Sequence, residues 1–237
     1  MKSICWKGYY MTNELNELEV REIKNLAKEK LGLCSKTNDI IGTQIFSILS
    51  MYARVIYYPL GQEAPWGFTR ISGSRDDAAL EKPFVAINSS ISMDRQVFAA
   101  AHELYHIWFE QNPDILPADL LNEQNKEVNE KKANRFAAEF LVSEQLLCQE
   151  IELYQIQEIT IKNILQLAAL FTVPYRTMVK RLYEIRRITQ AQQIIFLNET
   201  EENIEIYSKK YSIPKQAADE RVTLDNLTEL AVEAYEK

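Results

Sequence analysis

Cysteine is scarce in this chain of 237 residues, and the three that occur, Cys5, Cys34 and Cys148, are widely separated. An odd number of widely spaced cysteines does not make a disulfide framework and is typical of a protein with reduced thiols. Apolar runs long enough to cross a membrane are missing, and the N-terminal sequence MKSICWKGYYMTN lacks the apolar stretch of a signal peptide. The sequence therefore predicts a cytoplasmic protein that is not inserted in a membrane.

Positive charge is also in short supply, because 27 Lys and Arg residues stand against 34 Asp and Glu residues, a net charge of -7. This balance disfavours non-specific contact with nucleic-acid phosphates, so we do not expect direct nucleic-acid binding. From Glu199 onward there are ten acidic and five basic residues, so most of the excess negative charge lies in this last stretch. Length and a 46% share of hydrophobic residues fit one sizeable domain, residues 1–190, followed by an acidic helical extension, residues 191–237.

Histidine is rarer still, because the chain has only two, His102 and His106. They stand four residues apart, and Glu103 directly follows the first. On a helix this spacing puts both imidazoles on one face, one turn apart, where they can share a single metal ion. Two histidines placed at random would show this pattern about one time in a thousand or less, which favours a metal site over coincidence.

The surroundings of the two histidines predict a helix that is buried on nearly all sides. Residues 93–109 read MDRQVFAAAHELYHIWF, and Ser92 and Asp94 suit the N-terminus of such a helix. Burying two histidines and a glutamate there is costly unless each has a partner, and a divalent cation supplies these partners. The alternative, an ordinary amphipathic helix that happens to carry the three residues, needs an unrelated set of partners.

A third metal ligand has to come from another residue type. Catalytic zinc usually has three protein ligands and one open position, so a carboxylate or a cysteine must complete the set. Residues 123–142, EQNKEVNEKKANRFAAEFLV, predict a second helix with a carboxylate in a suitable place. Its apolar stripe consists of Ala133, Phe136, Ala137, Phe140 and Leu141. Glu130 falls within this stripe, which favours it as the ligand over a solvated charge, and Glu127 at the edge of the stripe is the alternative ligand.

Two neighbours of these ligands have predicted roles. Asn134, one turn after Glu130, can hydrogen-bond a ligating imidazole and fix its tautomer. Glu103 lies about 100° around its helix from His102, so we expect it to act on water as the catalytic base rather than to bind metal. The opposite side of the second helix is expected to carry Lys131, Lys132, Arg135 and Glu139.

At these residues the chain resembles the ImmA/IrrE metallopeptidases. AHELYHIWF and the later EKKANRFAAEFL are similar to the family's HExxH helix and to its second helix of the form ExxANxFAxxLL. PFVAIN at 83–88 and LQLAALFTVPYRTMVKRL at 165–182 resemble the strand and the closing helix pair that flank them. The resemblance implies a mixed α/β, gluzincin-like fold in which His102, His106 and Glu130 bind zinc and Glu103 is catalytic.

The sequence departs from the family pattern at three places. Tyr105 replaces a common glycine, Lys132 replaces a common acidic residue, and Val142-Ser143 stands where Met-Pro often follows the second helix. None of these changes removes a proposed ligand, but Tyr105 is expected to narrow the cleft.

The remaining pattern predicts further helices over 17–33 and 43–52 and strands over 54–58, 67–72 and 84–88, with another helix over 223–235. The strands would form a small sheet beside the active-site helix. Val85 to Asn88 fits either the sheet edge that pairs with a peptide substrate or plain sheet core. Trp66 fits either the wall of a substrate cleft or ordinary packing.

Together these features predict an α+β protein, with a mostly helical zincin-like core and a small sheet, that acts as a zinc endopeptidase on a protein substrate. The family resemblance implies that the substrate is a helix-turn-helix repressor of a mobile element or a stress response. The alternative is a non-catalytic regulatory protein with a structural metal that binds DNA or sequesters a repressor. It rests on residues 160–187, which also fit a helix-turn-helix with basic residues at Arg176, Lys180, Arg181, Arg186 and Arg187. We favour two helices packed on the core.

Overall fold

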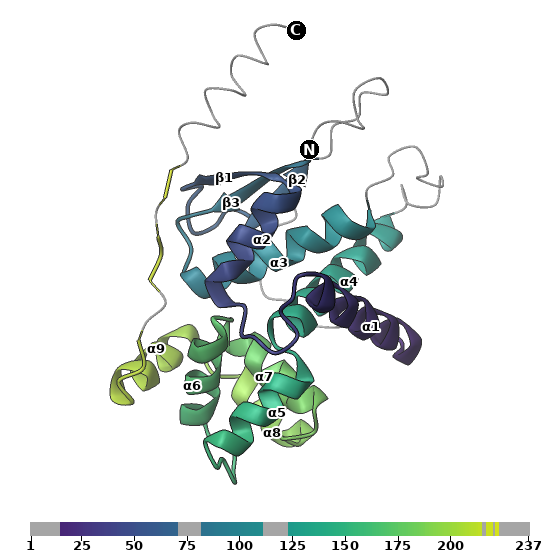
Figure 1. Cartoon of the computed structure of the whole chain (residues 1–237). Helices are drawn as coiled ribbons and strands as arrows, with labels where there is room; N and C mark the ends of the chain where they lie inside the picture. The colour runs from purple at the N-terminus through teal and green to yellow at the C-terminus, as the bar shows by residue number, and fades with distance from the viewer. Residues whose placement is uncertain (1–14, 71–81, 111–122, 215–216, 220, 223–237) are drawn as a thin grey trace, which may run out of the picture.

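The computed structural model describes residues 15–70, 82–110, 123–214, 217–219 and 221–222. Within these ranges the chain forms a three-stranded sheet and a larger set of helices, the mostly helical α+β architecture that the sequence predicts (Figure 1). The elements in chain order are α1 Glu17–Leu33, η1 Gly42–Gln44, α2 Ile45–Tyr52, β1 Arg54–Tyr58, β2 Gly67–Arg70, β3 Phe84–Asn88, α3 Met93–Phe109, α4 Glu123–Leu141, α5 Glu144–Leu153, α6 Ile161–Phe171, α7 Tyr175–Glu184, α8 Gln190–Leu197 and α9 Glu201–Lys210.

Local sequence signals account for most of these bounds. α1, β1, β3 and α3 have the predicted limits, and the predicted helix over 43–52 begins as the 3₁₀ turn η1. Capping boxes formed by Asn16 with Glu19 and by Thr160 with Asn163 define the starts of α1 and α6. The strand predicted over 67–72 is confirmed as far as Arg70, and its last two residues lie outside the described part of the chain, as does the helix predicted over 223–235.

The strand order in the sheet is β1-β3-β2, with β3 parallel to β1 and antiparallel to β2. β3 is therefore the central strand, so the prediction that Val85 to Asn88 forms a sheet edge is wrong and the alternative of sheet core is confirmed. The burial pattern explains why, because Val85 and Ile87 have no exposed surface and face helices on one side. β2 is an edge strand, and among the described residues no strand pairs with its other side.

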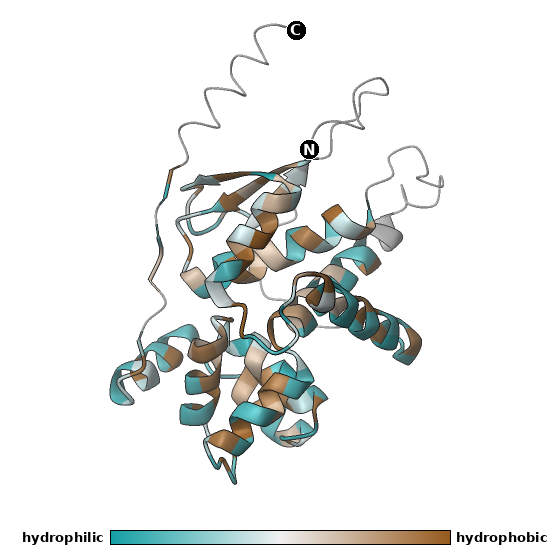
Figure 2. Cartoon of the chain, in the orientation of Figure 1, coloured by the Kyte–Doolittle hydropathy of each residue, from teal (hydrophilic) through white to brown (hydrophobic). Residues whose placement is uncertain are grey.

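Helix α3 lies at the centre of the fold, in contact with α2, β2, β3 and α4. In Figure 1 the sheet lies with α2 and α3 at one end of the molecule, and α5 to α9 lie at the other end. Hydrophobic residues are concentrated in α2 beneath the sheet, whereas much of α1 is hydrophilic (Figure 2). Buried residues of α2 are Ile45, Phe46, Ile48 and Leu49. Helix α3 is thus held between the sheet and other helices.

Helix α4 is covered on more sides than its sequence pattern predicts. The apolar stripe is buried as expected, and α4 packs on α3 and also on α1. Lys131 and Glu139, which the sequence places on the side opposite the apolar stripe, are only 9% and 4% exposed. They are buried because a second set of partners covers this side: Lys132 pairs with Glu19 of α1 at 3.2 Å, and Glu139 contacts α7.

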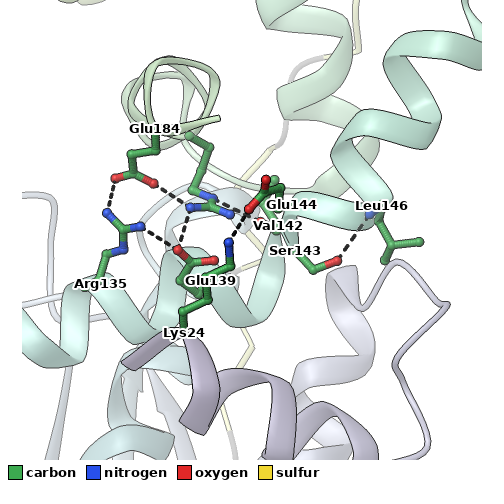
Figure 3. A network of polar contacts seen from close by, with 9 residues as sticks. Lys24, Arg135, Glu139, Val142, Ser143, Glu144, Leu146 and Glu184 are labelled. Carbon is green, nitrogen blue, oxygen red and sulfur yellow. Dashed lines mark hydrogen bonds and ion pairs between the residues drawn. The ribbon is translucent and has the colours of Figure 1, made fainter. Parts of the chain in front are cut away.

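A buried ion network joins α4 to α7 (Figure 3). Arg181 of α7 is 1% exposed, and its guanidinium lies 2.8 Å from Glu139 and 2.5 Å from Glu184. Arg135 of α4 contacts the same two carboxylates at 2.5 and 2.6 Å. Burial alone would lower the pKa of Arg181, but Glu139 and Glu184 raise it above its ordinary value. The network fixes α7 against α4.

The burial of Arg181 also bears on the helix pair α6 and α7. Because Arg181 points into the protein, it is not among the residues that can face DNA. Arg176, another residue of the predicted basic set, donates to the backbone oxygens of Leu197 and Glu199 at 2.8 and 3.4 Å. The pair therefore packs on the core, as the sequence analysis favoured.

The region after residue 190 contacts the rest of the chain at several points. α8 packs on α7 and α9 packs on α6, while Glu201 at the start of α9 pairs with Arg95 of α3 at 3.1 Å. The division at residue 190 stays a prediction. None of the described helices is both long and apolar enough to cross a membrane.

A short segment after α9 returns to the N-terminus of α3. Ser92 is the N-cap residue of α3, as predicted, but its side chain makes no capping hydrogen bond. Instead, the backbone N–H of Met93 donates to the oxygen of Ala217 at 3.3 Å. The returning segment thus satisfies one of the N–H groups that a helix start leaves unpaired.

Arg221 anchors the same segment. Its guanidinium lies 4.1 Å from the ring centre of Tyr57 and 4.7 Å from that of Phe46. It also donates to the side-chain oxygen of Gln96, a residue of α3 with no exposed surface. The contact joins α2, β1 and α3 around one cation.

The ion network supplies a test of the fold. Glu139→Gln removes the negative charge that lies between Arg135 and Arg181, so we expect the free energy of unfolding to fall by about 3 to 5 kcal/mol. The matched control is Lys24→Ala, which breaks an exposed pair with Glu144 and should cost about 1 kcal/mol or less. Urea denaturation of both variants measures the difference, and equal losses would contradict the role of the network.

Candidate metal centre

Helix α3 presents both histidines and Glu103 from its buried middle turns. The side chains of His102 and His106 are 3% and 13% exposed, and Glu103 is 5% exposed. The Nε2 atoms of the two imidazoles lie 3.0 Å apart, as expected for residues one turn apart on the same face. The predicted spacing therefore brings the two rings together at one point.

Glu130 of α4 meets the two imidazoles at this point. Its Oε2 lies 3.3 Å from Nε2 of His102, and its Oε1 lies 3.9 Å from Nε2 of His106. The ligand atoms of the three residues all lie within 4.8 Å of one another. Two imidazole nitrogens and a carboxylate oxygen suit a divalent transition metal such as zinc. The donor set therefore fits the metal that the sequence predicts.

The alternative ligand, Glu127, lies elsewhere. Its side chain is 62% exposed and pairs with Lys131 at 2.7 Å, and it is outside the cluster of possible ligands. Small residues explain why Glu130 comes close to α3, because Ala133 and Ala137 on the same stripe are fully buried and let the two helices approach. The structure thus separates two candidates that the sequence pattern only ranked.

Each imidazole has a hydrogen-bond partner on its other nitrogen. Nδ1 of His102 lies 3.2 Å from Oδ1 of Asn134, in the position that the sequence predicts. Nδ1 of His106 lies 2.7 Å from Oε2 of Glu110, a contact that the sequence analysis missed. An oxygen acceptor at Nδ1 holds the proton there and directs the lone pair of Nε2 toward the cluster. The sequence does contain a signal for this contact, because Glu110 stands four residues after His106 and residues at this spacing are neighbours on a helix.

Glu110 also acts on the charge of His106. Burial alone would lower the pKa of His106, but the hydrogen bond and the charge of Glu110, together with Glu103 and Glu130, raise it above its ordinary value. A carboxylate at Nδ1 makes the imidazole a stronger electron donor, which is the effect expected of a partner to a metal ligand.

Tyr105 lies in the core beside the histidines. It is 7% exposed and its ring packs against Phe109 and Phe136 at centroid distances of 5.1 and 5.7 Å. Burial raises the pKa of Tyr105 to about 12, so the hydroxyl stays neutral. It does not line the hollow beside Glu103, and the expectation that it narrows the cleft finds no support.

The carboxylate of Glu103 also contacts the sheet. Its Oε2 accepts a hydrogen bond of 2.6 Å from the hydroxyl of Thr69 on β2, a partner that the sequence did not indicate. A small hollow beside it is lined by Trp66, Gly67, Phe98, Ala99, His102 and Glu103. Trp66 packs edge-to-face on Phe98 at 6.3 Å, as the packing alternative predicts. Its role as the wall of a substrate cleft stays a prediction.

Comparisons with known proteins identify the family of this chain. No curated protein matches the sequence. Among solved structures, a Mycobacterium tuberculosis transcriptional regulator is similar over 72% of this chain and 48% of its own, with 15% sequence identity and a TM-score of 0.48, so this chain spans about half the length of that protein. The family model for the IrrE N-terminal-like domain, peptidase family M78, matches residues 52–183, which is more than half of the chain and includes α3 and α4. The chain therefore belongs to the ImmA/IrrE family of metallopeptidases.

Proposed function

We propose that this protein is a zinc-dependent endopeptidase, with His102, His106 and Glu130 as the metal ligands and Glu103 as the catalytic base. The observation that carries the proposal is the meeting of three ligand atoms from two helices, all within 4.8 Å of one another, beside a buried carboxylate that is not one of them. Three protein ligands leave one open position, which distinguishes a catalytic zinc site from a structural one.

The residues of the chain divide the chemistry among them. Zinc bound to this cluster supplies a Lewis acid that activates water and polarises the scissile carbonyl. Glu103 accepts a proton from the attacking water as the water oxygen bonds to the carbonyl carbon. It then gives that proton to the amide nitrogen as the carbon–nitrogen bond breaks, which releases a carboxylic acid and an amine. The proton of the acid passes to the amine, so the products are a carboxylate and an ammonium group. Asn134 and Glu110 keep the imidazoles oriented throughout.

The substrate peptide has a suitable edge to bind. β2 is an edge strand that contacts α3, and Gly67 and Trp66 line the hollow beside Glu103. An extended peptide that pairs with β2 would gain main-chain hydrogen bonds irrespective of its sequence, while the hollow selects a side chain. This assignment replaces β3, which is central.

We infer further that the substrate is a regulatory protein, and specifically a helix-turn-helix repressor of a mobile element or stress response. The support for this finer statement is the family to which the chain belongs. The alternative of a non-catalytic DNA-binding protein loses support because Arg181 is buried and Arg176 is bonded to backbone oxygens. A catalytically silent protein that sequesters a repressor is separated from a peptidase by whether the repressor is cut.

Metal binding is tested by elemental analysis of the purified full-length protein. We expect about one zinc per chain, and a loss of affinity of about 100-fold or more in His102→Ala and Glu130→Gln, since each removes a ligand. Asn134→Ala should cost about 10-fold, because it removes only a partner of a ligand. Glu127→Gln is the matched control and should bind zinc as wild type does. Zinc binding that is unaffected by His102→Ala would exclude the assigned site.

Catalysis is tested by co-expression with helix-turn-helix proteins encoded beside the gene. Wild type should shorten one of them, and Glu103→Gln should keep its zinc yet slow cleavage by about 100-fold or more, because the base is gone. Mass spectrometry of the fragments identifies the cut, and Glu127→Gln again serves as the control. Cleavage by Glu103→Gln at the wild-type rate would show that another group is the base.

A further inference from the structure

Strand β2 contacts both oxygens of the Glu103 carboxylate. The hydroxyl of Thr69 donates to Oε2 at 2.6 Å. Oε1 lies over Gly67, so close that a Cβ on this residue would be 3.2 Å from it. The same Cβ would lie 3.2 Å from the backbone oxygen of Ala86. The carboxylate therefore rests against the strand where the strand has no side chain.

The alternation of a β-strand explains why these two residues act together. Gly67 and Thr69 are two positions apart and pair with Ile87 and Val85 of β3, so they lie on the same face of β2. Phe68, between them, belongs to the other face and is 46% exposed. β2 thus turns a hydroxyl and a position without a side chain, which the Glu103 carboxylate fills, toward α3.

The hydrogen bond matters because Glu103 is nearly inaccessible to solvent. A buried carboxylate needs a partner, and the distance of 2.6 Å is in the range of a strong bond from a hydroxyl to an ionised oxygen. A glutamate side chain has three rotatable bonds, so a fixed contact at its end sets the direction of both oxygens. Thr69 is itself β-branched, and its own rotation about the first side-chain bond is restricted.

We propose that Thr69 is a positioning residue for the catalytic base. It holds Oε2 by its hydroxyl, and this sets Oε1 over Gly67, in the space beside the hollow, as the oxygen that exchanges the proton. The proposal rests on the proposed function, in which Glu103 is the base. Strand β2 thus has two roles: it pairs with the substrate peptide, and it orients the Glu103 carboxylate.

The experiment uses the zinc-loaded, full-length protein with Thr69→Val, which keeps the shape of the side chain and removes the hydroxyl, and with Thr69→Ser, which keeps the hydroxyl. Crystal structures of both should show the Glu103 carboxylate rotated in Thr69→Val and in its original place in Thr69→Ser. Zinc content and melting temperature should stay close to wild type in both. An unmoved carboxylate in Thr69→Val would overturn the proposal.

Kinetics give a second, independent readout on the substrate fragment found in the co-expression experiment. Thr69→Val should lower kcat by about 10- to 100-fold with KM changed by less than about threefold, since a misplaced group costs rate rather than binding. Thr69→Ser should restore most of kcat. Full kcat in Thr69→Val, or an equal loss in Thr69→Ser, would refute the positioning role. Activity in Glu103→Gln would instead refute the proposed function, so the two failures are distinguishable.

Discussion

The close approach of α3 and α4 is the constraint on which the rest of the structure depends. Two imidazoles on one helix and a carboxylate on another can share a metal only if the helix backbones come near, and Ala133 and Ala137 allow this because they add almost no bulk to the interface. Phe136 and Phe140 of α4 stack on each other and are buried beside this interface. A bulky residue at either alanine would separate Glu130 from the histidines.

Burial then imposes a second condition, because polar groups inside the protein need partners. Four residues supply these partners: Asn134 for His102, Glu110 for His106, Thr69 for Glu103, and Glu130 for the two histidines together. Each contact also sets an orientation, so the partners that remove the cost of burial also fix the directions of the imidazoles and of the Glu103 carboxylate.

The surrounding elements keep α3 and α4 in place. α1 covers one side of α4, and the ion network of Arg135, Glu139, Arg181 and Glu184 fixes its C-terminal half to α7. The start of α3 receives the segment that contains Ala217 and Arg221. Residues close to the C-terminus therefore support the helix that carries the histidines, although the sequence analysis placed them in a separate extension.

The sequence by itself determined the local features: the bounds of α1, β1, β3 and α3, the joint face of His102 and His106, and the preference for Glu130 over Glu127 as the nearby carboxylate. These follow from periodicity and spacing, which are properties of one element at a time. Only the tertiary structure decided which strand is central, which polar residues of α4 are buried, and that Arg181, Glu110 and Thr69 serve as partners inside the protein. The reason is physical: strand order and the partner of a buried charge depend on elements far apart in the chain, and a hydroxyl such as that of Thr69 has no pattern of its own until a carboxylate lies against it.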